Sequence, residues 1–328
     1  MVEIYGTLGP ACASADTLEA MLREGMTGVR LNLSHVALSE AAPMVEALRE
    51  AGRRCGLTPK LLIDMQGPEL RIKALPAPIE LREGEAVSLD FVSAPIREKI
   101  AAGQEILLDD GKLLLRAIDG QHAEVLRGGL LASRKSIALP GLELRLPPLT
   151  ESDRRNLALA CDYGVTGVMQ PFVRCREDLD ALREELNRHG GEEIRIFAKI
   201  ENREGVARLT ELMPAADELV IARGDLGNSG PLWELPALQK RIAAACRGAG
   251  KPFMVVTQML ASMADAPVPT RAEVSDIFNA VADGAAAVMV TNETAVGHYP
   301  AEVIRYLAKT AAEAEKWTVA QASSAADR

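Results

Sequence analysis

Two short stretches of this sequence place ionisable side chains where runs of strand-forming residues end. Lys199 and Glu201 follow one such run, and Arg223 and Asp225 follow the next. Because side chains two positions apart on a strand point the same way, each pair is expected to share one side. An ammonium beside a carboxylate, with a second carboxylate at the next strand end, suits an anionic substrate bound through Mg²⁺. Two exposed ion pairs are the alternative, but that interpretation leaves the matching positions unexplained.

Eight such runs alternate with amphipathic helical runs along the chain. The predicted strands are Glu3–Leu8, Gly28–Leu33, Lys60–Met65, Gly164–Met169, Ile194–Ile200, Glu218–Ala222, Pro252–Val256 and Ala286–Val290. The predicted helices are Ser14–Glu24, Leu38–Ala51, Thr150–Cys161, Arg176–His189, Gly205–Met213, Pro236–Ala249, Arg271–Ala282 and Pro300–Glu315. Thr150 with Asp153, and Pro300 in a first turn, are typical helix starts. The alternation predicts an α/β protein, a closed (β/α)₈ TIM barrel rather than an open doubly wound sheet.

The predicted barrel is interrupted after its third strand. Residues 68–146 contain short alternating runs separated by turn signals such as Asp109-Asp-Gly111. We predict that this segment is a small β-barrel-like lid domain, and that 1–67 and 147–328 form the barrel domain. Removing its 79 residues from 328 leaves 249, close to the ~250 residues typical of this barrel.

Composition limits the classes of partner and compartment. Aromatic residues make up 3% of the chain and the net charge is −9, so we expect neither nucleic acid nor a membrane surface as a partner. Five cysteines without a CxxC pair favour reduced thiols, and the four histidines lack the spacing of a zinc site. With no run near the ~20 apolar residues of a membrane span and no signal-peptide pattern, we expect a cytoplasmic protein.

The predicted carboxyl ends of the strands hold much of the chain's polar functionality, and the opposite ends look bland. In this barrel, chemistry is carried at the carboxyl ends, so the asymmetry indicates an enzyme. The polar strand ends are Thr7–Pro10, Asn32–His35, Asp64–Gln66, Gln170–Phe172, Lys199–Glu201, Arg223–Asp225, Thr257–Gln258 and Thr291–Glu293.

Taken together, these segments resemble the pyruvate kinase family. The matching strings, in family order, are Gly6-Thr-Leu-Gly-Pro10, Val29-Arg-Leu-Asn-Leu-Ser-His35, Asp64-Met-Gln-Gly-Pro-Glu-Leu-Arg71, Asp109-Asp-Gly111, Ser133-Arg-Lys135, Ala198-Lys-Ile-Glu-Asn202, Ala222-Arg-Gly-Asp-Leu-Gly227, Thr257-Gln-Met-Leu260, Pro269-Thr-Arg-Ala-Glu-Val-Ser-Asp276 and Asn292-Glu-Thr294. The family fold is a barrel with a mobile β-domain lid in this position. The family's C-terminal domain has no counterpart in this sequence, so the resemblance is to a short form.

The resemblance implies transfer of the phosphoryl group of phosphoenolpyruvate to ADP, giving pyruvate and ATP, with Mg²⁺ and K⁺ as cofactors. Lys199 would neutralise the transferring group and the enolate oxygen, and Thr257 would bind the substrate carboxylate and help protonate the enolate carbon. The other implied roles are phosphoryl contact by Arg30, carboxylate binding by the amides of Gly224 and Asp225, Mg²⁺ binding by Glu201 and Asp225, nucleotide binding by Pro10, Asn32, His35, Arg71 and Lys135, and K⁺ binding by Asn32, Ser34, Asp64 and the Met65 carbonyl.

Several positions depart from the family pattern. Gln66 stands where many relatives have lysine, Pro171 and Asn292 replace small residues near the phosphate, and Glu40 stands at the nucleotide-stacking tyrosine position. Lyase or decarboxylase chemistry on a 2-oxoacid, through a metal-held enolate, therefore stays open as an alternative. A non-catalytic regulatory homologue is the third hypothesis, and the retained Lys199 argues against it. A homo-oligomer formed through the barrel domain also stays open.

Glu69 bears on the expected K⁺ requirement. A second carboxylate near the cation cage would repel an anionic substrate unless a monovalent cation compensates. Family members that dispense with K⁺ carry a lysine at this position. A Glu69–Arg71 pair within the loop would instead predict indifference to K⁺.

Overall fold

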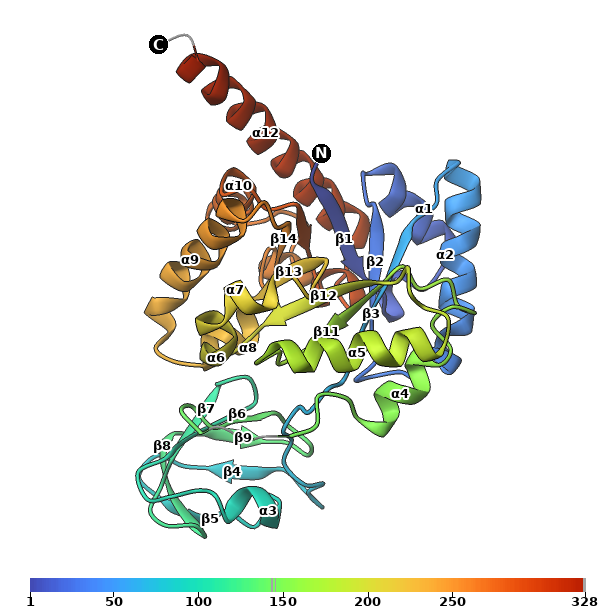
Figure 1. Cartoon of the computed structure of the whole chain (residues 1–328). Helices are drawn as coiled ribbons and strands as arrows, with labels where there is room; N and C mark the ends of the chain where they lie inside the picture. The colour runs from blue at the N-terminus through green and yellow to red at the C-terminus, as the bar shows by residue number, and fades with distance from the viewer. Residues whose placement is uncertain (143, 145, 327–328) are drawn as a thin grey trace. The chain divides into compact units, whose positions relative to one another are not determined.

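The structure, a computed structural model, describes residues 1–142, 144 and 146–326. Its main sheet consists of β1 Glu3–Thr7, β2 Gly28–Asn32, β3 Lys60–Asp64, β11 Gly167–Gln170, β12 Arg195–Ile200, β13 Glu218–Ala222, β14 Phe253–Val256 and β15 Ala287–Met289. These strands are parallel and close into a barrel in the order β1-β15-β14-β13-β12-β11-β3-β2 (Figure 1). The predicted (β/α)₈ barrel with a β insertion after the third strand is confirmed.

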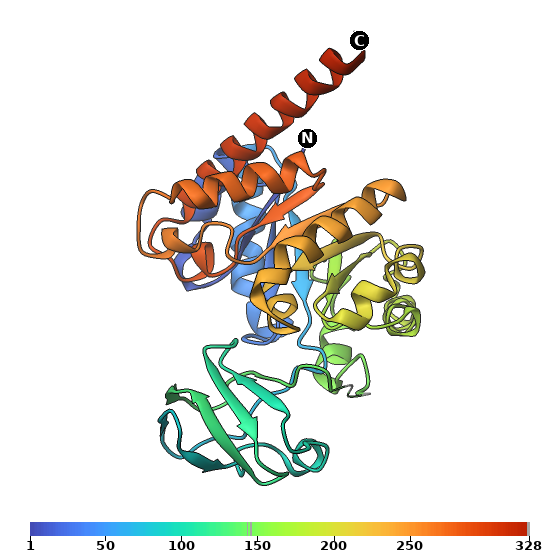
Figure 2. The ribbon, with the colours of Figure 1, turned by 90° about the vertical axis from the view of Figure 1, so that its left-hand side faces the viewer.

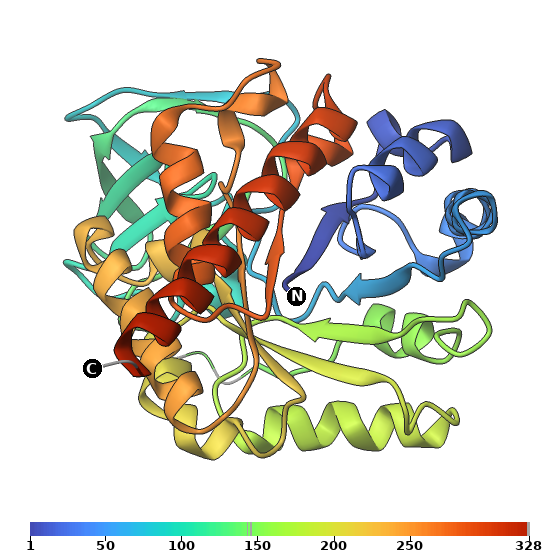
Figure 3. The ribbon, with the colours of Figure 1, turned by 90° about the horizontal axis from the view of Figure 1, so that it is seen from above.

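Helices follow the strands and surround the barrel (Figure 3). They are α1 Ala15–Arg23, α2 Ala42–Cys55, α4 Glu151–Leu157, α5 Arg176–Arg188, α6 Arg203–Ala207, α7 Leu209–Leu212, α8 Arg223–Asn228, α9 Leu235–Gly248, α10 Arg271–Ala282, α11 Asn292–Ala295 and α12 Pro300–Ala326. Thr150 caps α4 by accepting the Asp153 N–H at 3.1 Å, and Pro300 opens α12, as predicted. None of the helices in the described part of the chain combines the length and apolarity needed to cross a bilayer.

Several predicted elements differ from the structure. The helix expected over Leu38–Ala51 is a 3₁₀ turn, Leu38–Ala41, followed by α2, and the helix expected over Thr150–Cys161 ends at Leu157. The single helix expected over Gly205–Met213 is two short helices, because Arg208 leaves the helical conformation between them. The last helix continues past Glu315, since the Ala-rich sequence that follows has high helix propensity. Arg223 and Asp225 were expected to share one side of a strand, but β13 ends at Ala222 and both residues lie in α8. Residues two apart on a helix are ~200° apart around its axis, so the strand argument fails for this pair.

The barrel interior is a packed core rather than a pore. Alternate strand residues point inward, as the side-chain period of a strand requires, and they fill the space in layers. This core comprises Tyr5, Leu62, Met169, Phe197, Val220, Ala222, Met254, Val256, Ala287 and Met289. The polar residues at the strand ends therefore lie on strands whose positions are fixed by this packed core.

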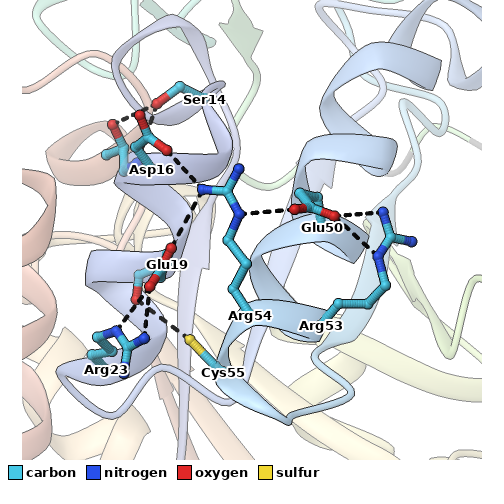
Figure 4. A network of polar contacts seen from close by, with 9 residues as sticks. Ser14, Asp16, Glu19, Arg23, Glu50, Arg53, Arg54 and Cys55 are labelled. Atoms are coloured by element: carbon cyan, nitrogen blue, oxygen red, sulfur yellow. Dashed lines mark hydrogen bonds and ion pairs between the residues drawn. The ribbon is translucent and has the colours of Figure 1, made fainter.

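The seam between α1 and α2 is covered by an ion-pair network (Figure 4). Arg54 lies 2.7 Å from Asp16 and 2.8 Å from Glu50, and it also reaches Glu19 at 3.4 Å. Arg23 binds Glu19 at 2.7 Å on the same surface. These pairs are exposed, so each contributes little to stability. They hold two outer helices together and form no site.

The chain folds into two compact units, of which the first comprises 1–67, 148–223 and 236–328, and the second comprises 68–147 and 224–235. The second unit contains α3 Ala94–Arg97 and the strands β4 Ile79–Leu81, β5 Ala86–Ser88, β6 Glu105–Leu108, β7 Leu113–Ala117, β8 His122–Arg127, β9 Gly129–Leu131 and β10 Ile137–Ala138. Its strands form an antiparallel sheet, β10-β6-β7-β8-β5, and a β4-β9 pair (Figure 2). Asp109 and Asp110 both have positive φ in the β6–β7 turn, where a turn was predicted. The lid-domain boundaries at 68 and 146 stay a prediction.

Candidate active site

Four charged side chains meet at the carboxyl ends of β2, β3 and β12. The Lys199 Nζ lies 2.9 Å from Glu201 Oε1 and 3.3 Å from both carboxylate oxygens of Asp64. The Arg30 guanidinium holds Asp64 Oδ2 from the other side, at 2.7 and 2.8 Å. The prediction that Lys199 and Glu201 share one side is confirmed. The structure also joins Arg30 and Asp64 to them, two residues that the resemblance had assigned to different ligands.

This cluster of Arg30, Asp64, Lys199 and Glu201 is buried and electrically balanced. The side chains of Asp64 and Glu201 are only 3% and 1% exposed, and those of Arg30 and Lys199 are 12% and 13% exposed. Burial alone would raise the pKa of Asp64, but the charges of Lys199 and Arg30 outweigh it and hold that pKa below its ordinary value. Two cations therefore face two carboxylates, and each compensates the burial of the other.

Glu201 is fixed by a backbone group that no sequence pattern singles out. The Phe172 N–H donates to Glu201 Oε2 at 2.7 Å, and Phe172 has a φ of 54°. A non-glycine residue in the left-handed region is strained and persists only where its surroundings hold it.

Gln170, at the end of β11, is fully buried and donates to the Asp178 carbonyl at 2.9 Å. Its Oε1 has no hydrogen-bond partner among the described residues.

The backbone of Thr257 is fixed by the side chain of Arg223. Two nitrogens of the Arg223 guanidinium donate to the Thr257 carbonyl at 3.0 and 2.7 Å, and a third binds the Asp276 carboxylate at 2.7 and 2.9 Å. Thr257 and Gln258 have φ values of 83° and 57°, so two consecutive non-glycine residues lie in the left-handed region. Arg223 stabilises this strained turn. Its pairing with Asp276 crosses from the end of β13 to α10 and leaves no local signal in the sequence.

The loop after β3 is organised by Asp153. Its two carboxylate oxygens accept the N–H groups of Gln66 at 3.0 Å and Gly67 at 3.1 Å, in addition to the Thr150 N–H at 2.8 Å. Asp153 was predicted only as part of a helix start. Its second role was missed because the loop lies 86 residues away in the sequence.

The expected K⁺ ligands are oxygen donors at the ends of β2 and β3. Asn32 Oδ1 accepts the Ser34 N–H at 3.1 Å and its carbonyl accepts the His35 N–H at 3.2 Å, which folds this stretch into a tight turn. Met65 is buried and its N–H donates to the Met169 carbonyl at 3.1 Å. Carboxylate, amide, hydroxyl and carbonyl oxygens are the ligands that hard cations prefer, so the donor set fits a monovalent cation.

The remaining predicted residues belong to other segments of the chain. Pro10 is exposed and opens a 3₁₀ turn, η1 Pro10–Cys12, while Gly224 and Asp225 lie in the first turn of α8, within the second unit. Arg71 and Lys135 also belong to the second unit. Two ion pairs hold them there: Arg71 with Glu69 at 2.8 Å and Lys135 with Asp109 at 2.7 Å.

Both ion pairs bear on predicted roles. Burial would raise the pKa of Asp109, but Lys135 and Lys112 hold it below its ordinary value. The Glu69–Arg71 pair is the arrangement that we named as the alternative to a K⁺ requirement.

No group of three or more His, Cys, Asp and Glu side chains within the described residues could hold a metal ion. Glu201 and Asp225 nevertheless supply the carboxylate oxygens that Mg²⁺ prefers. Mg²⁺ is commonly bound through one or two carboxylates and completes its shell with substrate phosphate and water. The donor chemistry therefore fits Mg²⁺, provided that a substrate contributes the remaining ligands.

Comparison with known proteins agrees with the geometry. A family model described as pyruvate kinase, barrel domain, matches residues 1–304. The chain is similar to the pyruvate kinase of Geobacillus stearothermophilus, with 39% identity over 335 residues that cover 96% of this chain and 57% of the relative. It is also 39% identical to that of Aeropyrum pernix, covering 71% of the relative, and 36% identical to that of Clostridium acetobutylicum, covering 69%. The chain thus spans little more than half of the first of these relatives.

Proposed function

Because the chain belongs to the pyruvate kinase family, we propose that it transfers the phosphoryl group of phosphoenolpyruvate to ADP, giving pyruvate and ATP. The observation that carries this proposal is the position of the Lys199 ammonium, within 3.3 Å of two buried carboxylates at the carboxyl ends of the barrel strands. A cationic group held by buried anions is oriented before a phosphoryl group binds, so the site needs little reorganisation during the reaction.

In this reaction an oxygen of the ADP terminal phosphate attacks phosphorus, and the bond from phosphorus to the enol oxygen breaks. Negative charge is then spread over the phosphoryl oxygens and the enolate oxygen, so catalysis depends mainly on positioning and charge stabilisation. Lys199 would stabilise both of these oxygen sites, and Arg30 would contact the phosphoryl group. Both cations are already oriented by Asp64.

The enolate must next gain a proton at its terminal carbon to become pyruvate. We assign the relay of this proton to the Thr257 hydroxyl, whose backbone Arg223 fixes. The substrate carboxylate would bind to Thr257 and to the N–H groups of Gly224 and Asp225 in the first turn of α8. Arg223 is a positioning residue in this scheme, since it acts through Thr257.

Two cations complete the proposal. Glu201 and Asp225 would hold Mg²⁺, which when bound supplies positive charge to the phosphate oxygens. Asn32, Ser34, Asp64 and the Met65 carbonyl would hold K⁺. We propose that the nucleotide is contacted by Pro10, Asn32, His35, Arg71 and Lys135, the last two from a lid domain formed by residues 68–146.

A coupled assay of the full chain with phosphoenolpyruvate, ADP, Mg²⁺ and K⁺ tests the proposal. We expect pyruvate and ATP in equal amounts, and ATP formation slower by ~10²-fold or more in the Lys199→Met variant. A parallel reaction contains a 2-oxoacid such as oxaloacetate and no nucleotide. Loss of the 2-oxoacid without any transfer from phosphoenolpyruvate would favour the lyase alternative, and inactivity in both reactions would favour a non-catalytic homologue.

A further inference from the structure

The segment that follows β14 contains two consecutive strained residues and is held at one end by Arg223. Thr257 and Gln258 have positive φ, whereas the next two residues, Met259 and Leu260, are fully buried. Strained backbone of this kind persists only where its surroundings over-determine it. The Arg223 guanidinium fixes the first end of the segment through the Thr257 carbonyl. Whatever fixes the second end also affects how well the Thr257 hydroxyl keeps its orientation.

Glu293 holds that second end. It follows β15, the strand next to β14 in the barrel, and its Oε1 accepts the Leu260 N–H at 3.3 Å. Its Oε2 accepts the N–H and the hydroxyl of Thr291 at 2.6 and 3.2 Å. The sequence singles out Glu293 as a polar residue at a strand end but gives it no role. In the structure, this one carboxylate joins the segment after β14 to the segment after β15.

The chemistry of Glu293 explains why a carboxylate is needed there. Glu293 is only 2% exposed, and its partners among the described residues are two backbone N–H groups and one hydroxyl, with no cation. A buried charge is costly, so a neutral side chain would be easier to bury. However, both oxygens face backbone N–H donors, and a glutamine amide would turn its own NH₂ group toward one of them. Only a group that accepts at both ends can hold Leu260 and Thr291 together.

The short helix that carries Glu293, α11, is itself fixed against β1 and its loop. The Thr294 hydroxyl donates to the Thr7 carbonyl at 3.0 Å and accepts the Thr7 N–H at 2.8 Å. A Cβ placed on Gly9 would lie 2.4 Å from the Ala295 carbonyl oxygen, so the two backbones are in close contact. Glu293 therefore holds the Leu260 end from a rigid support.

We propose that Glu293 is a positioning residue for the proton transfer. It holds the Leu260 end of the segment while Arg223 holds the Thr257 end, and together they keep the Thr257 hydroxyl in the orientation that the relay requires. The hydrogen bonds of Glu293 go to Leu260 and Thr291, so its effect on the reaction passes through the backbone. This inference rests on the proposed function, which assigns the proton relay to Thr257.

Exchange of the methyl hydrogens of pyruvate with D₂O isolates the proton step. A C–H bond of bound pyruvate breaks, the proton leaves through the Thr257 hydroxyl, and a deuteron returns to the same carbon, while no bond to phosphorus changes. Proton NMR measures this exchange for the full chain with pyruvate, Mg²⁺, K⁺ and inorganic phosphate, after subtraction of the rate without protein. We expect Glu293→Gln to lower both the exchange rate and kcat in the coupled assay roughly tenfold, with KM for ADP unchanged.

A double variant shows whether the effect passes through Thr257. ATP formation stays measurable in Thr257→Ala, because enolpyruvate that is released can take up its proton from water. Adding Glu293→Gln to Thr257→Ala should lower ATP formation less than twofold, since the hydroxyl that Glu293 orients is already absent. A tenfold loss in both backgrounds would overturn the proposal. Unaltered exchange and kcat in Glu293→Gln would overturn it as well.

Hydrogen exchange of the Leu260 amide tests the anchor without any reference to activity. At a temperature well below unfolding, this amide should exchange at least tenfold faster in Glu293→Gln. Glu185→Gln is the matched control, because Glu185 is also a buried carboxylate but pairs with Arg154 and Arg188 on the outer helices. It should change neither the amide exchange nor kcat.

The two kinds of failure are distinguishable. Absence of ATP formation by the unmodified chain would refute the proposed function. Leu260 protection that Glu293→Gln leaves unaltered would overturn the inference while the proposed function stands. If Glu293→Gln does not fold, Glu293→Asp takes its place: it keeps the charge but is too short to hold both Leu260 and Thr291, so the same losses are expected.

Discussion

Lys199 occupies a position where its charge is shared before any substrate arrives. It contacts both oxygens of Asp64 and one oxygen of Glu201, so a phosphoryl group must compete with carboxylates for it. Because of that competition, we expect the proposed reaction to need further cations. When Lys199 turns toward the phosphoryl group, Asp64 and Glu201 lose part of their compensation, and the cations proposed beside them would restore it.

The first prediction concerns Lys199 itself. Lys199→Met should lower turnover by ~10²-fold or more, because a pre-oriented positive charge is lost where negative charge develops. Steady-state turnover in the coupled assay measures this effect, and circular dichroism checks the fold. Arg23→Met, which removes an exposed charge paired with Glu19, is the matched control. Turnover close to normal in Lys199→Met would remove Lys199 from the mechanism.

A second prediction concerns Arg223. Arg223→Lys keeps the charge but cannot bind the Thr257 carbonyl and the Asp276 carboxylate at the same time, as the guanidinium does. We expect kcat to fall ~10-fold, since the Thr257 hydroxyl loses its fixed orientation, while KM for ADP stays unchanged. A change in KM alone would show that Arg223 does not act through Thr257. Arg53→Lys on the α2 surface should change neither constant.

At the residue scale, the sequence reveals groups that act through their own side chains at strand ends. Lys199 and Glu201 could be paired from their spacing alone. Phe172 and Asp153 could not be assigned their roles, because one acts through its backbone N–H and the other reaches a loop distant in sequence. Long-range contacts of this kind follow from barrel closure, which a single sequence does not report directly.

Among the elements, the loop after β3 depends on close backbone approach. Gly67 has a φ of 58°, and a Cβ placed on it would lie 2.4 Å from Cγ of Pro171. Gly56 has a similar φ of 67° at the end of α2, but a Cβ there would meet nothing within 4 Å. An alanine at Gly56 would therefore be strained only by its left-handed backbone, whereas an alanine at Gly67 would also clash with Pro171.

We expect Gly56→Ala to lower the free energy of unfolding by about 1–2 kcal/mol, the cost of the left-handed conformation alone. Gly67→Ala should cost roughly 1–3 kcal/mol more, because the added methyl overlaps the Pro171 ring. Urea unfolding of both variants measures the difference. Adding Pro171→Ala to Gly67→Ala should recover part of it. Equal losses in the two single variants would mean that the loop yields to the methyl group.

The presence of the barrel strands could be predicted from the sequence, but the residues at which they end could be predicted less well. All eight barrel strands coincide with β-rich runs bounded by polar residues, since burial on both faces of a parallel sheet demands continuous apolar sequence. The conformation of Arg223 and Asp225 was not predictable in this way. The run of strand-forming residues and the helix that follows it meet without a turn signal, so the spacing rule was applied beyond the end of the strand.

For the whole molecule, the K⁺ requirement depends on which carboxylates are already compensated. Glu69 pairs with Arg71, and this pair favours indifference to K⁺. The charge of Asp64, however, is balanced by Arg30 and Lys199, and both of these cations are proposed to contact the substrate. We therefore expect turnover with Mg²⁺ to fall when K⁺ is replaced by tetramethylammonium at equal ionic strength. Glu69→Lys should reduce that difference by supplying an ammonium. Equal rates of the unmodified chain in both salts would show that the internal ion pairs suffice.

The stability of the molecule should also depend on the opposite end of the barrel. Charged residues begin four of the strands there, so the expectation that these ends are bland is wrong. They are Glu3, Lys60, Arg195 and Glu218. Burial raises the pKa of Glu218 to about 7, against an ordinary value of 4.5 in an unfolded chain. A raised carboxyl pKa means that the folded chain binds the proton more tightly than the unfolded chain does. The stabilisation from this proton is therefore complete below pH 4.5 and is lost as the pH rises toward and through 7.

The side chain introduced by Glu218→Gln does not titrate, so the stability of this variant should not fall for this reason as the pH rises. Between pH 4.5 and pH 8, the free energy of unfolding of the unmodified chain should fall relative to that of Glu218→Gln by up to roughly 3 kcal/mol. Urea unfolding of both proteins across this range measures this change. Glu80→Gln, which removes a charge from an exposed pair with Arg82, should follow the unmodified chain. At any single pH the variant also loses its ionic bond to Arg195, so the change with pH is the decisive quantity. A constant difference across the range would mean that Glu218 titrates at an ordinary value in the folded chain.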